Sequence, residues 1–149
     1  AHPGESEHHT GLAVDLALYF ESTGLSDDFT GEGPYVWIKD NAWRYGFIQR
    51  YPEEKAAVTG ISGETWHYRY VGLPHAMLIA EHNFCLEEYL DWLKQYPFEG
   101  QHLTVDCLGK RYEICRCTGE VFEPAEGETV LSGDNVDGFL VTVCLGDAE

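Results

Sequence analysis

A single carboxylate inside an apolar run most constrains how this chain of 149 residues can fold. Residues 11–19 read GLAVDLALY, and the alternation of Leu and Val with smaller or polar side chains predicts a β-strand. Asp15 stands in this run between Val14 and Leu16. Burying an ionised carboxylate is unfavourable unless it is paired, so the fold has to bring Asp15 to a partner. A metal ion is the simplest partner, and backbone donors are the alternative.

Two histidines can complete a metal site around this carboxylate. His8 precedes the predicted strand, and His67 lies in a second alternating run, residues 66–71. Two imidazoles and one carboxylate match the ligand set of a catalytic zinc site that leaves one position open for water. Glu64, just before His67, could take a proton from that water. The sequence has no His-Glu-x-x-His motif, which argues against the common zincin proteases.

Each of these residues also has an ordinary explanation. His8 beside His9 could be an exposed polar pair, and Glu64 could be a solvated turn residue. The joint pattern of two histidines and a carboxylate on an apolar strand favours the metal site over these separate explanations.

Acidic residues dominate the composition. The chain has 26 Asp and Glu against 9 Lys and Arg, a formal net charge of -17. Such a surface repels phosphate backbones and anionic headgroups, so we expect neither nucleic-acid binding nor direct binding to a membrane surface. No apolar run reaches the roughly 20 residues needed to span a bilayer. The chain lacks an initiator Met and begins close to its first motif, which predicts that an upstream segment is missing.

The pattern along the chain predicts an α+β fold, in which an antiparallel sheet carries the metal site and helices pack against it. Composition changes near Pro97, so we expect a peptidase core over residues 1–97 and a small C-terminal β extension over residues 98–149. The remaining predictions are a loop over 21–34, helices over 36–45, from Pro74 onward and over 86–96, and strands over 47–51, 103–107, 111–117 and 139–144.

The five cysteines include no Cys-x-x-Cys pair, so a zinc site built from four cysteines is not expected. One disulfide across the predicted hairpin is possible, but five buried or half-buried thiols are favoured.

Two spaced motifs together resemble a known enzyme signature. Ser6-x-His8-x-x-Gly11-x-Ala13-x-Asp15 and Glu64-x-Trp66-His67 are similar to the paired motifs of zinc D-alanyl-D-alanine carboxypeptidases and dipeptidases of the VanY and VanX types. These enzymes share a fold with lysostaphin-like peptidases and the Hedgehog signalling domain. Residues 109–114 and 132–138 resemble the C-terminal part of VanY, which VanX-type dipeptidases lack, so VanY is the closer type.

The resemblance implies a role for each motif residue. Zn²⁺ would be held by His8, Asp15 and His67, and Glu64 would be the general base. Ser6 would bond the terminus of the substrate, and Trp66 would form a wall of the substrate site.

Two departures from the family pattern bear on activity. The usual Glu-Pro-Trp-His reads Glu-Thr-Trp-His here, and Thr65 lacks the stiffness of proline, which could loosen the base. The family's catalytic arginine lies upstream of the first motif, where this chain has no counterpart, so we expect low activity from residues 1–149 alone. Arg69 is not an obvious replacement, and we expect it to pair with an acidic residue instead.

The function implied by the resemblance is zinc-dependent removal of the terminal D-Ala from peptidoglycan stem peptides, or their precursors, ending in D-Ala-D-Ala. VanY-type enzymes act outside the cytoplasmic membrane from an N-terminal anchor, so membrane contact is expected only through such an anchor. A cytoplasmic location stays open. Two alternatives also stay open, a catalytically weak zinc-containing cell-wall-binding module and a cell-wall endopeptidase of the same fold.

Overall fold

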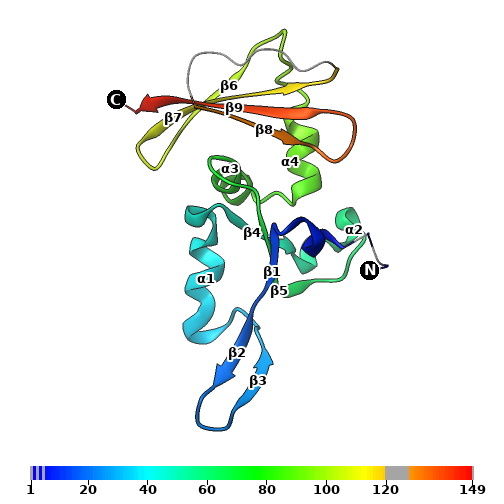
Figure 1. Ribbon diagram of the computed structural model, residues 1–149, viewed down its shortest axis with the longest axis vertical. Coiled ribbons are helices and arrows are strands. Elements are labelled where there is room, and N and C mark those ends of the chain that lie inside the picture. The colour runs from blue at the N-terminus through cyan, green and yellow to red at the C-terminus, as the bar shows by residue number, and fades with distance from the viewer. Residues whose placement is uncertain (1, 3, 5, 120–127, 149) are drawn as a thin grey trace. The chain divides into compact units, whose positions relative to one another are not determined.

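The computed structural model describes residues 2, 4, 6–119 and 128–148, and it divides into two compact units, Ala1–Glu87 and Glu88–Glu149 (Figure 1). Antiparallel sheets and helices both occur, as the predicted α+β class requires. In the described part of the chain, no helix is both long and apolar enough to cross a membrane.

A three-stranded antiparallel sheet forms the centre of the first unit. Its order is β1 (Ala13–Asp15), β5 (Glu64–Tyr70) and β4 (Phe47–Tyr51). The middle strand is buried on both faces, since neighbouring residues His67 and Tyr68 point to opposite sides and are both almost inaccessible to solvent. This central position makes β5 a rigid support for the side chains that it carries.

The predicted strand over residues 11–19 is two strands in the structure. After β1 the chain enters β2 (Ala17–Phe20), which pairs with β3 (Leu25–Asp28) as a separate hairpin (Figure 1). The prediction of an unbroken loop over residues 21–34 was therefore wrong. No apolar alternation indicates a strand there, because β3 is exposed along its whole length and an exposed strand needs no such alternation.

Short helices surround the sheet of the first unit. The predicted helix over residues 36–45 is confirmed as α1 (Val36–Asn41) followed by a 3₁₀ turn, η3 (Ala42–Tyr45), which ends at Gly46. A side chain at Gly46 would come within 2.7 Å of the Tyr70 ring, so glycine is required there for packing as well as for its positive φ. The other helical segments are η2 (Gly33–Tyr35), η4 (Glu53–Lys55), α2 (Ala56–Thr59) and α3 (His75–His82).

The second unit is built on a four-stranded antiparallel sheet. Its order is β6 (Leu103–Cys107), β7 (Lys110–Cys117), β9 (Phe139–Asp147) and β8 (Glu128–Gly133). The predicted hairpin of β6 and β7 is confirmed, whereas β8 was missed because it is almost entirely exposed. All five cysteines are free thiols.

The division between the units lies earlier than the predicted boundary at residues 97/98, within α4 (Leu86–Leu93). The segment after α4 is bonded to the sheet of the second unit, because Phe98 N–H donates to the Arg116 carbonyl and Arg116 N–H donates to the Tyr96 carbonyl, each at 2.8 Å. These bonds join the connecting segment to β7.

Candidate metal centre

His8 is presented by a short 3₁₀ turn, η1 (Glu7–Thr10). Ser6 caps the turn, and its hydroxyl accepts the His8 N–H at 3.4 Å. The turn ends at Gly11, whose φ of 72° lies in the left-handed region that glycine adopts at no steric cost. The chain can therefore reverse into β1 directly after presenting the His8 ring.

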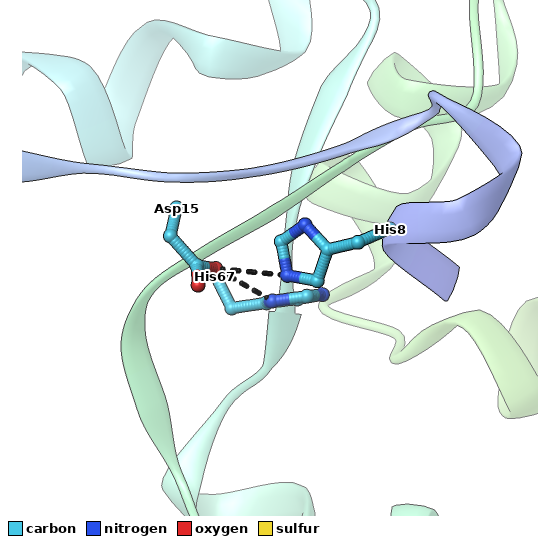
Figure 2. A group of neighbouring side chains, drawn as sticks. All are labelled: His8, Asp15 and His67. Atoms are coloured by element: carbon cyan, nitrogen blue, oxygen red, sulfur yellow. Dashed lines mark hydrogen bonds and ion pairs between the residues drawn. The ribbon is translucent and has the colours of Figure 1, made fainter. Parts of the chain in front are cut away.

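Strand pairing brings the other two predicted ligands together. Asp15 on β1 lies directly opposite His67 on β5, and residues opposite each other on neighbouring strands share a face of the sheet. The Asp15 Oδ1 atom is 2.8 Å from His67 Nδ1 and 3.3 Å from His8 Nε2. Figure 2 shows both rings turned toward this one carboxylate oxygen. The potential ligand atoms of the three residues lie within 4.8 Å of one another.

The chemistry of this donor set fits zinc. Two imidazole nitrogens and a carboxylate oxygen converge, which is the ligand set of catalytic zinc sites with an open position. The His67 side chain is only 6% exposed, while those of His8 and Asp15 are 40% and 52% exposed. The cluster is therefore anchored on the buried strand and open to solvent on its other side, where a substrate could approach.

Glu64 lies beside the cluster without joining it. Its Oε2 atom is 3.8 Å from His67 Nδ1, and its side chain is 30% exposed. Residues three apart on a regular strand point to opposite faces, but the pairing of β4 with β5 is irregular between Gln49 and Tyr51, which removes strict alternation at this point. The position suits a base that acts next to a metal, and the assignment of Glu64 as that base stays a prediction.

Thr65, which stands where the family pattern has proline, is tied to the rest of the first unit. Its hydroxyl donates to the Phe29 carbonyl at 2.6 Å, and Phe29 is buried. This bond restrains the segment that carries Glu64, which argues against the loosening expected from the loss of proline.

The two predicted substrate-binding residues are both half-buried. The Ser6 hydroxyl is engaged by the η1 cap, and the Trp66 carbonyl accepts the Leu16 N–H at 2.9 Å. Contact of either side chain with a substrate stays a prediction.

Sequence reasoning missed Glu7, which lies on the other side of the His67 ring. Glu7 Oε1 is 2.9 Å from His67 Nε2 and accepts the Tyr51 hydroxyl at 3.3 Å. Arg69 donates to Glu7 Oε2, so the predicted ion pair of Arg69 with an acidic residue is confirmed. Arg50 Nε lies 3.4 Å from Glu7 Oε1, and the rest of its guanidinium forms two bonds to Glu87. In the sequence, Glu7 occupies a position that the first motif leaves unspecified, between Ser6 and His8, and its acidic side chain was the only indication of a role.

Charge pairing sets the ionisation of this cluster. Burial alone would raise the pKa of Glu7, but hydrogen bonds from Arg69 and His67 and the positive charge of Arg50 together lower it. Burial likewise opposes ionisation of Glu87, yet its bonds with Arg50 lower the pKa of that carboxyl. Both carboxylates are therefore ionised at neutral pH.

The chain is similar in sequence to known D-alanyl-D-alanine carboxypeptidases. The profile of the VanY family, described as D-alanyl-D-alanine carboxypeptidase, matches residues 1–73. A D-alanyl-D-alanine carboxypeptidase of Enterococcus faecium is 43% identical over 150 residues, covering 98% of this chain and 46% of the relative. The bifunctional D-Ala-D-Ala dipeptidase and carboxypeptidase VanXYC of Enterococcus gallinarum is 44% identical over 95 residues, covering 62% of this chain and 50% of the relative. The chain thus spans about half the length of these curated relatives.

Solved structures extend the similarity to both units. The vancomycin-resistance D,D-dipeptidase VanXYg, in complex with a D-Ala-D-Ala phosphinate analogue, matches with a TM-score of 0.85 and 36% identity, covering 97% of this chain and 60% of that one. The LD-carboxypeptidase LdcB matches with a TM-score of 0.53 and 44% identity, covering 61% of this chain and 42% of that one.

Proposed function

The chain belongs to the VanY family, and from this premise we propose that it is a zinc-dependent D,D-carboxypeptidase. Its substrate would be a peptidoglycan stem peptide ending in D-Ala-D-Ala, from which it would remove the last D-Ala. The observation that carries the proposal is the convergence of His8, Asp15 and His67 on one face of the sheet, with Glu64 beside them. Because the stem peptides of the assembled cell wall lie outside the cytoplasmic membrane, the proposal includes an extracytoplasmic site of action.

The proposed roles follow from the positions of the side chains. His8, Asp15 and His67 would hold the zinc ion, which when bound would polarise the scissile carbonyl and lower the pKa of a water toward about 7. Glu64 accepts the proton of the attacking water, whose oxygen bonds to the carbonyl carbon. As the C–N bond breaks, Glu64 passes that proton to the nitrogen of the leaving D-Ala. The open side of the cluster, at His8 and Asp15, admits the peptide.

Two arginines near the site are not assigned to the reaction. Arg69 bonds Glu7, and Arg50 bonds Glu87 and lies against Glu7. An oxyanion is stabilised by a donor aimed at the place where negative charge develops, and both guanidinium groups are already engaged by carboxylates.

A hydrolysis assay with a matched pair of variants tests the proposal. The zinc-loaded chain is incubated with a stem pentapeptide ending in D-Ala-D-Ala, and released D-Ala is measured. Release should depend on zinc and disappear in Glu64→Gln, while Glu81→Gln, an exposed change on α3, should act like the unsubstituted chain. Zinc binding without any release would contradict the proposed activity and favour a cell-wall-binding module. Cleavage only of a stem tetrapeptide would favour the L,D-specificity named for LdcB.

A further inference from the structure

The His67 imidazole faces a carboxylate at each of its nitrogens. Asp15 Oδ1 lies 2.8 Å from Nδ1, and Glu7 Oε1 lies 2.9 Å from Nε2. A neutral imidazole has one N–H donor and one acceptor nitrogen, and only the nitrogen without the proton can bind a metal. The partner at each nitrogen therefore decides which of them is free for the metal.

Building on the zinc site proposed above, we propose that Glu7 is a positioning residue that reserves Nδ1 of His67 for the metal. The Glu7 carboxylate accepts a hydrogen bond, so it favours the proton on Nε2. Nδ1 is then left with its lone pair toward Asp15 and His8, the other residues of the cluster. Glu7 is not itself a ligand of that cluster, because it meets the ring at the opposite nitrogen.

The Glu7 carboxylate is held in position against the His67 ring by contacts with several side chains. Its side chain is 16% exposed, and those of Arg50 and Arg69 are 13% and 12% exposed. Arg69 binds the oxygen that does not contact His67, which leaves Oε1 directed at the ring. The Tyr51 hydroxyl donates to the same Oε1, and the Tyr51 ring stacks on the His67 ring at 5.2 Å between centroids. The carboxylate and the imidazole are thus restrained as one group.

The surroundings of Glu7 also explain why a carboxylate is needed instead of a neutral acceptor. An ionised acceptor makes a stronger hydrogen bond to an imidazole N–H than a neutral one does. The nearly buried Arg69 guanidinium bonds Glu7 and requires an anionic partner, and the positive charge of Arg50 lies beside the same carboxylate. Partners of this kind orient a metal-binding histidine, and their removal typically lowers metal affinity by about 10- to 100-fold.

Zinc competition with a chelator tests the inference on purified protein. Glu7→Ala should weaken zinc binding by about 10- to 100-fold, and Glu7→Gln, which keeps an acceptor oxygen, should weaken it less. The matched control is Glu87→Gln, which removes a carboxylate from Arg50 but has no bond to His67 among its described contacts, and it should bind zinc like the unsubstituted chain. Equal zinc affinity in folded Glu7→Ala and the unsubstituted chain would overturn the role of Glu7. If the unsubstituted chain binds no zinc, the proposed function itself fails.

Nitrogen NMR of the histidine rings gives a second test that needs no Glu7 variant to fold. In the zinc-loaded, unsubstituted chain, His67 should carry its proton on Nε2, and Nδ1 should show the shift of a metal-bound nitrogen. The reverse assignment, with the proton on Nδ1, would overturn the inference. The His67 signals are identified by their loss in His67→Gln.

Discussion

The Glu7 carboxylate and the Asp15 carboxylate lie on opposite nitrogens of one buried ring, that of His67. The ring is further restrained by the stacked Tyr51 and by the edge of the His8 ring, at 4.7 Å between centroids. A histidine fixed in this way loses little rotamer freedom when it binds a ligand, which favours binding. His67 is therefore the residue on which the candidate site depends most.

Replacing His67 should remove zinc binding. His67→Ala takes away the one buried member of the cluster, so we expect at least about a 100-fold loss of zinc affinity, beyond the effect of losing an outer partner. Metal analysis after dialysis measures it. His102→Ala is the control, because His102 pairs with Glu113 in the second unit. Equal zinc content in both variants would remove His67 from the ligand set.

Replacing Glu64 should separate binding from hydrolysis. Glu64→Gln keeps the size of the side chain but cannot take a proton, so we expect normal zinc content and a fall in D-Ala release of about 10²- to 10⁴-fold. Both quantities are measured on the same preparation. Loss of zinc in this variant would make Glu64 a ligand and not a base.

Replacing Arg69 should lower stability. Arg69→Met leaves the Glu7 carboxylate, 16% exposed, without one of its partners. A buried charge left with no partner typically costs about 3–5 kcal/mol, and since Arg50 and His67 still contact Glu7 we expect a loss at or below the lower end of that range. Urea unfolding of the metal-free protein measures the change. Arg111→Met is the matched control, since the Arg111–Asp106 pair is exposed and should contribute little. Equal stability of the two variants would show that the Glu7 cluster is not held by its charges.

Acid should destabilise the first unit through His75. Burial lowers the pKa of His75 to about 4, from an ordinary value of 6.5. Between these values the unfolded chain binds a proton that the folded chain does not. The part of the free energy of unfolding that depends on neutral His75 is therefore fully present above about pH 6.5 and is lost as the pH drops toward 4. The free energy of unfolding against pH should decline less in His75→Gln than in the unsubstituted chain over this range. Identical slopes would show that His75 does not contribute.

Much of the candidate site could be predicted from the sequence, because Asp15 and His67 lie on strands whose apolar pattern is clear. The alternation around Asp15 and around His67 indicated two strands, and their pairing brings both side chains to one face. The spacing of the motifs could not reveal Glu7, because its contacts with His67 and Arg69 join residues far apart in the chain. Long-range hydrogen bonds between polar side chains leave no periodic signal.

The strands β3 and β8 could not be predicted for a different reason. β3 and β8 lie at sheet edges and are mostly exposed, so nothing selects apolar side chains at alternate positions. Their backbone bonds to β2 and β9 hold them in place, and such bonds place no demand on residue type.

The register of β1 against β5 has a consequence for which changes the chain can tolerate. A shift of one residue would turn every side chain of β1 to the other face, so Asp15 would leave His67 and Val14 would replace it. Point substitutions between His8 and Asp15 can leave this pairing intact, but a one-residue insertion or deletion there cannot be absorbed without losing either the strand or the cluster. The length of this segment is thus constrained more tightly than its composition, whereas a change of length between β2 and β3, in a hairpin outside the central sheet, leaves the pairing of β1 with β5 untouched.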